Sequence, residues 1–427
     1  MSNLKVLIVG GTFSTERNEK PNAGYSTLHE SDGGDIVMTH EYGTCSGLVA
    51  KVFEAMKQYT SNIMCYNGGR YDHLATILDE AGNYDIVFWW PNVDNNLPKI
   101  RDIKAKHPNI MLITSKRNIN EKYNFGELVQ RALMSKSNLV FEFSNIPPIV
   151  TPVLNGKMYY KIKVFDPLGC VWADTTDVEE AVCKAMERLL YLKSITRQQT
   201  IQSDTDKSLV LKWYFDQFKL DDKQADGKIP ECNNTDLDTF VEIVKFYAHK
   251  FQELMPDGCK TERFVGNASI KPKFPQVGRC GKGMPSFKHD GMVWVSKRNV
   301  DKQFIDRDCF VPVYLEDGKL YYYGEDKPSV DSPVQIRLYD ALPNIRYMLH
   351  SHCYLQTADV TTTKAIPCGA IEEVDEILSC IDDQIGDRTK TEYTINILGH
   401  GSIVMCADLL GFDDLLYVER QLPEKMF

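Results

Sequence analysis

The stretch Tyr347-Met348-Leu349-His350-Ser351-His352 places three apolar residues directly before a His-x-His pair. In a β-strand, residues two apart point to the same face of the sheet. His350 and His352 are therefore expected side by side at the end of a strand. Neutral imidazole is a common zinc ligand, and zinc takes three or four such ligands. The pair predicts half of a metal site, and the alternative interpretation is two histidines on a polar strand face.

A third histidine follows a second apolar strand. Residues 395–398 form the apolar run, and His400 stands between two glycines. Glycine lets the backbone turn sharply and approach another chain segment closely. Upstream, Asp331 stands where a helix is expected to begin, so it is a candidate helix N-cap as well as a candidate ligand. One carboxylate and three histidines make a plausible zinc set.

Several short motifs in the second half of the chain resemble those of the class II aldolase/adducin family. Their order and spacing from about Thr235 onward carry the resemblance. In chain order they are Gly266-Asn267-Ala268-Ser269, Gly291-Met292-Val293-Trp294-Val295, Asn299-Val300-Asp301-Lys302, Lys327-Pro328-Ser329-Val330-Asp331, Leu342-Pro343, His350-Ser351-His352 and Gly399-His400-Gly401. The set is most similar to that of ribulose-phosphate 4-epimerases, in which an aspartate replaces the glutamate of fuculose-phosphate aldolases. Asp331 takes that position.

The resemblance implies an α/β/α domain with a mainly antiparallel sheet and a zinc ion held by His350, His352 and His400. Asp331 would be a fourth ligand or a base close to the metal. Zinc would act as a Lewis acid that stabilises an enolate. We therefore expect a zinc-dependent lyase or epimerase whose substrate is a small molecule, a phosphorylated or acidic sugar. A sugar-phosphate dehydratase uses the same histidine triad and is an alternative.

The resemblance also implies a phosphate-binding set. Asn267, Ser269 and Ser329 match phosphate-binding positions of the family. The family's Ser/Thr-Gly pair aligns with Arg298-Asn299, so Lys297 and Arg298 are candidate phosphate contacts, Arg as a bidentate fork. The alternative for these two is a solvated strand end. The altered set favours a substrate other than the common pentulose or hexulose phosphates.

The connection after the histidine pair, residues 353–365, is short. The aldolases and epimerases have a longer excursion there, with a catalytic Tyr or Asp that reaches the neighbouring subunit. Its loss favours the other main hypothesis, a non-catalytic aldolase-fold scaffold or sensor, as in adducin. Tyr417 and Glu419 in an expected last helix are further candidates for proton transfer. Because the family usually forms tetramers, we expect a homo-oligomer.

Composition describes an ordinary soluble protein. The chain has 427 residues, 43% hydrophobic and 25% charged, which suits two domains or more. A formal charge of −10 argues against a nucleic-acid binder, whose footprint is usually basic. No apolar run approaches the roughly 20 residues that span a membrane, so no membrane partner is expected. Without a signal peptide, the 12 scattered cysteines indicate reduced thiols and a cytoplasmic location.

The first half alternates short apolar strands with amphipathic helices. This pattern predicts a doubly wound, Rossmann- or flavodoxin-like parallel sheet. The expected strands are residues 5–11, 62–66, 85–90, 109–114 and 138–143. We place this α/β domain at residues 1–201, a linker at 202–234 and the aldolase-like zinc domain at 235–427.

Ligands of doubly wound sheets bind beyond the carboxyl ends of the strands. Gly10, Gly11, Thr12 and Gly68 are expected at two such ends, with Asn67-Gly68-Gly69 breaking the second strand. They are candidates for binding a nucleotide or a phosphorylated ligand. The alternative is that these glycines only make tight turns, since neither a Gly-x-Gly-x-x-Gly after the first strand nor a Gly-Lys-Thr/Ser is present.

Overall fold

The structure is a computed structural model. It describes residues 3–14, 46–92, 100–118, 122–145, 160–197, 217–227, 229, 236–254, 266–272 and 291–412. Contacts divide the chain into two compact units, Met1–Tyr214 with Phe427, and Phe215–Met426. No helix in these described ranges is long and apolar enough to cross a membrane.

In the described part of the N-terminal unit, strands form one seven-stranded sheet in the order β2-β1-β3-β4-β5-β6-β7. β1 to β5 are parallel neighbours, and β6 and β7 continue the sheet antiparallel. The strands are β1 (Val6–Ser14), β2 (Ile63–Arg70), β3 (Ile86–Trp89), β4 (Met111–Arg117), β5 (Leu139–Asn145), β6 (Tyr160–Phe165) and β7 (Val171–Thr175). The predicted parallel sheet is confirmed, with an antiparallel edge in addition.

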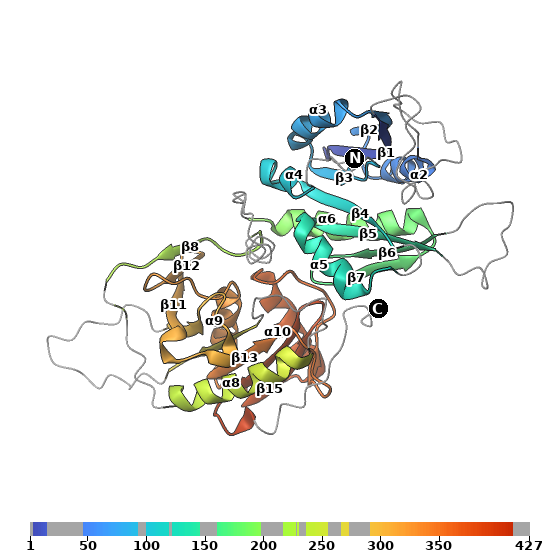
Figure 1. The fold of residues 1–427 in the computed structure, drawn as a ribbon. Helices are drawn as coiled ribbons and strands as arrows, with labels where there is room; N and C mark the ends of the chain where they lie inside the picture. Colours follow the sequence, from blue (N-terminus) through green and yellow to red (C-terminus); the bar gives the residue numbers. More distant parts are fainter. Residues whose placement is uncertain are drawn as a thin grey trace. The chain divides into compact units, whose positions relative to one another are not determined.

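Helices cover this sheet (Figure 1). They are α2 (Gly47–Met56), α3 (His73–Glu80), α4 (Ile100–Lys106), α5 (Phe125–Ser135) and α6 (Val178–Ile195). Side chains at alternate positions of β1, such as Leu7 and Val9, pack with Leu74 of α3 and Ile103 of α4. Local sequence fixes the helix starts: Ser46 accepts a hydrogen bond from the Val49 amide, and Asn124 and Glu127 form a capping box.

Two strands extend further than predicted. Gly10, Gly11 and Thr12 lie inside β1, and Asn67-Gly68-Gly69 lie inside β2 and do not break it. The two strands stay paired beyond an irregularity between Gly10 and Phe13, so that Phe13 lies opposite Gly69. A β-bulge absorbs an extra residue without ending the pairing, which is why glycines that read as strand ends continue the strand here.

In the C-terminal unit, the described strands form a nine-stranded sheet in the order β14-β15-β16-β13-β9-β10-β11-β12-β8. The pairing is antiparallel except at β12–β8 and β14–β15. The strands are β8 (Asp222–Gln224), β9 (Asn267–Ile270), β10 (Val293–Ser296), β11 (Phe310–Glu316), β12 (Lys319–Tyr322), β13 (Tyr347–Ser351), β14 (Val360–Thr361), β15 (Glu392–Ile397) and β16 (Gly401–Cys406). This is the predicted α/β fold with a mainly antiparallel sheet.

Helices lie on both faces of this second sheet. The helices are α8 (Leu237–Leu254), α9 (Ser332–Ala341) and α10 (Glu372–Gln384). Along β13, Tyr347 and Leu349 pack in the cluster that contains α8, whereas Met348 packs in the cluster that contains α9 and α10. Because side chains alternate along a strand, His350 shares the face of Met348. The first histidine therefore faces the side of the sheet that carries α9 and α10.

Parts of the predicted domain organisation remain predictions. The proposed limits 1–201 and 235–427 are close to the two compact units, but residues 198–216 and 230–235 lie outside the described ranges. Within the predicted linker, Asp222–Gln224 form edge strand β8 beside β12. Tyr417 and Glu419 of the expected last helix lie outside the described residues.

Candidate metal centre

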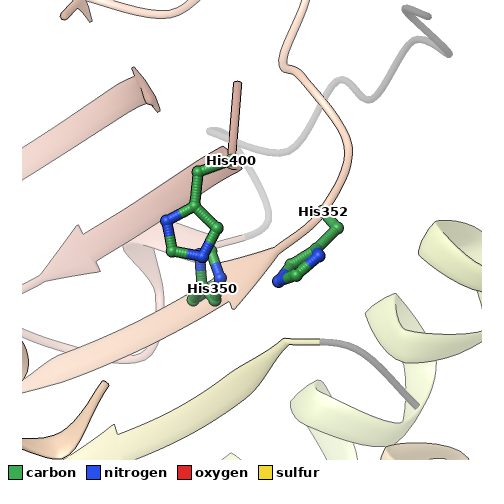
Figure 2. Close-up of side chains that lie close together, drawn as sticks. All are labelled: His350, His352 and His400. Carbon is green, nitrogen blue, oxygen red and sulfur yellow. The ribbon is translucent and has the colours of Figure 1, made fainter. Parts of the chain in front are cut away.

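Three imidazoles meet at one end of the second sheet. His350 comes from β13, and His352 follows directly after its last residue; His400 lies in the turn between β15 and β16. The ring centroids are 4.5 Å apart for His350 and His400, 5.0 Å for His352 and His400, and 5.1 Å for His350 and His352. Figure 2 shows the three rings turned toward one another.

A close backbone approach brings His400 to the pair. A Cβ atom at Gly401 would lie 2.0 Å from the backbone oxygen of Ser351 and 2.6 Å from Cα of His352. Gly401 also has φ of 129°, which disfavours any larger residue. Glycine at this position therefore lets the β15–β16 turn touch the end of β13.

Hydrogen bonds fix the orientation of two of the rings. Nδ1–H of His350 donates to the carbonyl oxygen of Ser402 over 2.9 Å. Nδ1 of His400 lies 2.7 Å from Oε1 of Glu373. The Nε2 atoms of His350 and His400 are buried and have no hydrogen-bond partner within the described residues. A buried nitrogen without a partner is costly, so these two Nε2 atoms are candidate metal-binding atoms.

The pKa values of the three histidines are shifted in different directions. Burial, together with neighbouring His400, lowers the pKa of His350 to about 3. Burial likewise depresses the pKa of His352 well below its ordinary value. Burial also acts against charge on His400, but the adjacent Glu373 carboxylate outweighs it and raises the pKa of His400. His350 and His352 are thus neutral, which is the form that binds metals.

Asp331 stands at the start of α9, beside the histidines. Its Oδ2 lies 4.0 Å from Nε2 of His350 and accepts a hydrogen bond from Asn267 over 2.7 Å. Although it is the residue before α9, its side chain makes no capping hydrogen bond to the helix. Its carboxylate instead contacts Asn267 and lies near His350, and its role as a ligand or a base stays a prediction.

Two further groups at the site were missed from sequence. Cys368 is buried and donates from Sγ to Oδ1 of Asp331 over 3.0 Å. Glu373, in the first turn of α10, is the partner of His400. Cys368 lies just before α10 and Glu373 lies in its first turn, so one short segment supplies both. The sequence holds no spacing signal for either, since each is brought in by tertiary packing.

The predicted phosphate-binding residues on the sheet are engaged with protein groups. Asn267 donates to Asp331, and its Oδ1 accepts from Gln335. Ser269 is fully buried, and its hydroxyl pairs with that of Tyr339 over 3.0 Å. Asn267 thereby positions Asp331. A phosphate role for either residue stays a prediction.

Of the other three predicted phosphate contacts, Ser329 lies near the start of α9, and Lys297 and Arg298 follow directly after β10. Ser329 is buried, and its hydroxyl accepts from the Asp331 amide over 3.4 Å. Lys297 pairs with Asp326 over 2.8 Å, and it lines a cavity of about 610 Å³ that none of the three histidines lines. The Arg298 guanidinium lies 4.0 Å from Asp222. Phosphate binding by Ser329, Lys297 and Arg298 stays a prediction too.

The candidate ligand residues of the N-terminal unit lie in β1 and β2. Gly10 packs against α2, because a Cβ there would lie 2.2 Å from Cγ2 of Val49. Thr12 is buried, and its hydroxyl accepts from Asn92 over 3.3 Å. Gly11 and Gly68 lie in β1 and β2. Close packing thus explains Gly10, and ligand binding by Gly10, Gly11, Thr12 and Gly68 stays a prediction.

The donors at this site fit a divalent metal. One ligand atom from each of the three histidines lies within 4.8 Å of the others, and the same holds for Asp331, Cys368 and His400. Imidazole, carboxylate and thiolate are the zinc ligands of proteins. Together with the two unpartnered Nε2 atoms, this makes the cluster a candidate metal centre.

Part of the C-terminal unit matches a known family model. Residues 253–407 match the family model described as Class II Aldolase and Adducin N-terminal domain. None of the curated proteins compared with the chain matches it.

Solved structures similar to the chain include both aldolases and a flavoprotein. L-fuculose 1-phosphate aldolase has 15% identity and a TM-score of 0.29, covering 43% of this chain and 81% of its own. YgbL from Escherichia coli, a putative aldolase/epimerase/decarboxylase, has 16% identity and a TM-score of 0.27, covering 44% and 87%. The DNA/pantothenate metabolism flavoprotein from Streptococcus pneumoniae has 10% identity and a TM-score of 0.31, covering 44% and 99%.

The family match at residues 253–407 agrees with the order of motifs and with the mainly antiparallel sheet. Residues 253–407 are therefore similar to the class II aldolase and adducin family, as the family model indicates.

Proposed function

We propose that this protein is a zinc-dependent lyase or epimerase that acts on a phosphorylated or acidic sugar. The observation that carries the proposal is the convergence of three imidazoles, two of which are buried and have Nε2 atoms without a hydrogen-bond partner in the described residues. The class II aldolase and adducin match supports it, because aldolase chemistry needs a group that stabilises an enolate.

His350, His352 and His400 would hold the zinc ion. When bound, zinc would supply Lewis-acid stabilisation of negative charge on a substrate oxygen. The Ser402 carbonyl and the Glu373 carboxylate hold two of the rings with Nε2 directed inward. Asp331 stands 4.0 Å from His350, where it would take a proton from the substrate carbon. Asn267 holds that carboxylate in place.

Solvent-hydrogen exchange on simple sugar-phosphate fragments tests the proposal. The zinc-loaded protein would be incubated in D₂O with a panel of phosphorylated α-hydroxyketones, dihydroxyacetone phosphate among them, and followed by NMR. Enolate formation predicts deuterium at the carbon beside the carbonyl. The double variant His350→Ala/His352→Ala should show no exchange, and equal exchange in that variant would contradict the proposal.

The second candidate function is a non-catalytic aldolase-fold scaffold or sensor, fused to a nucleotide-binding-like domain. The short connection after the histidine pair favours it. The backbone amides of Thr363 and Lys364 donate hydrogen bonds to the Glu376 carboxylate of α10, and β14 pairs with β15. These contacts hold the segment against the rest of the domain. Zinc binding without exchange or turnover on the panel would favour the scaffold. Loss of water from a sugar phosphate, seen in the same spectra, would instead favour the dehydratase.

The N-terminal unit would bind a second ligand or a partner. The whole protein would form a homo-oligomer, a tetramer by analogy with the family. Light scattering of the purified protein tests the oligomer. A monomer would contradict this part of the proposal.

A further inference from the structure

The segment that leads into α10 brings a thiol to the histidine cluster. Cys368 is 1% exposed, and its Sγ lies 3.0 Å from Oδ1 of Asp331. Ligand atoms of Asp331, Cys368 and His400 all lie within 4.8 Å of one another. His400 also belongs to the group with His350 and His352. The two groups share His400, so the thiol lies next to the three-histidine group.

These separations are compatible with shared coordination. Zinc binds sulfur at about 2.3 Å and imidazole nitrogen at about 2.0–2.1 Å, so a tetrahedral site puts the two donor atoms about 3.5 Å apart. Shared coordination requires side-chain rotation that brings the Cys368 thiol to this distance from the three imidazoles. The Nε2 atom of His400 is buried and has no hydrogen-bond partner in the described part of the chain, which leaves it available for a metal shared with Cys368.

We propose that Cys368 is a metal ligand in the substrate-free protein and completes a set of three imidazoles and one thiolate. The inference rests on the metal site of the proposed function. On coordination the S–H bond breaks, its proton leaves to solvent, and a sulfur–metal bond forms without any change of oxidation state. A bound divalent cation deprotonates a coordinating thiol, so burial of Cys368 in the metal-free protein does not prevent this step.

Coordination by Cys368 has a consequence for Asp331. Oδ1 of Asp331 gives up its thiol donor, while Oδ2 keeps the hydrogen bond from Asn267. The carboxylate then stays in place with one oxygen available, which suits a base more than a fourth ligand. A substrate oxygen would take the position of the thiolate. A thiolate donor also favours zinc or cobalt over magnesium or manganese.

X-ray absorption spectroscopy of the full-length zinc-loaded protein, without substrate, tests this inference. The protein would be compared with Cys368→Ser and with the control Cys380→Ser. Cys380 is also buried and also donates to a carboxylate, Glu376, from within α10. It is therefore matched to Cys368 in chemistry but is not part of either candidate metal group.

We expect a zinc–sulfur distance of about 2.3 Å in the wild type and in Cys380→Ser, and its loss in Cys368→Ser. A wild-type spectrum with nitrogen and oxygen ligands only would overturn the inference and leave the three-histidine site intact. A sulfur signal that persists in Cys368→Ser would also overturn it. Absence of zinc from the wild type would overturn both the inference and the proposed function. The wild-type spectrum decides the question even if Cys368→Ser does not fold.

Discussion

Oε1 of Glu373 lies 2.7 Å from Nδ1 of His400, and both side chains are buried. A carboxylate in this position fixes the tautomer and the ring orientation of a metal-binding histidine and raises its basicity. The partner of His350 is instead a backbone carbonyl, that of Ser402. The charge of Glu373 therefore makes His400 the more basic of the two oriented donors, in agreement with its raised pKa.

Glu373→Gln should weaken zinc binding. The amide keeps an oxygen that accepts from His400 but loses the negative charge, so zinc affinity should fall by about 10-fold, the lower end of the range for such partners. Competition with a chromogenic chelator measures the affinity. Glu376→Gln, one turn along α10 and bonded to Thr363 rather than to a histidine, is the control and should keep wild-type affinity. Equal affinities for both variants would exclude a role for the Glu373 charge.

Gly10→Ala should destabilise the N-terminal unit, because the new Cβ would meet Cγ2 of Val49 at 2.2 Å. Overpacking of this kind costs about 1–3 kcal/mol. Adding Val49→Ala removes the clash, so the double variant should lose less stability than the two single variants predict together. Chemical denaturation of all four proteins measures the coupling. If Gly10→Ala is as stable as the wild type, the close contact between β1 and α2 is wrong.

Lys104 of α4 should make stability depend on pH. It is 1% exposed, its Nζ donates to Asn138 and to the carbonyl of Ile110, and burial lowers its pKa to about 7 from an ordinary 10.5. Between these two values the unfolded chain holds a proton that the folded chain lacks, so the free energy of unfolding rises with pH across this window. Below about pH 7 both the folded and the unfolded chain hold this proton, so Lys104 no longer makes the free energy of unfolding depend on pH.

Lys104→Met should remove this part of the pH dependence, which denaturation at several pH values between 7 and 10 measures. The exposed Lys106 on the same helix, paired with Asp79, provides the control Lys106→Met, which should keep the wild-type slope. A Lys104→Met profile parallel to that of the wild type would show that Lys104 stays charged in the fold.

Much of the fold follows from local patterns. The apolar strands that alternate with helices predict the parallel sheet, and Tyr347-Met348-Leu349 predicts β13 with His350 at its end. The continuation of β1 and β2 through their glycines could not be read locally, because it depends on how Phe13 pairs with Gly69 across two strands. The antiparallel edge strand β7 is likewise set by pairing with β6.

Some residues of the candidate metal centre could also be predicted from local sequence, and others could not. His350 and His352 lie at the end of an apolar strand, and His400 stands between two glycines that permit close approach, so local sequence predicts all three. No local sequence pattern predicts a role for Cys368 or Glu373, because only the packing of α10 brings them to Asp331 and His400. The sequence also suggested Asn267 as a phosphate contact, and only the structure shows that it holds Asp331.

Metal content of the purified protein tests the central claim most directly. Elemental analysis of the wild type should give about one zinc per chain, as expected for a single site with three or four protein ligands. His350→Ala/His352→Ala should lose that zinc, and circular dichroism should show that the variant stays folded. A wild type that binds no zinc even after zinc is added, or a double variant that retains it, would contradict the metal centre described by His350, His352 and His400.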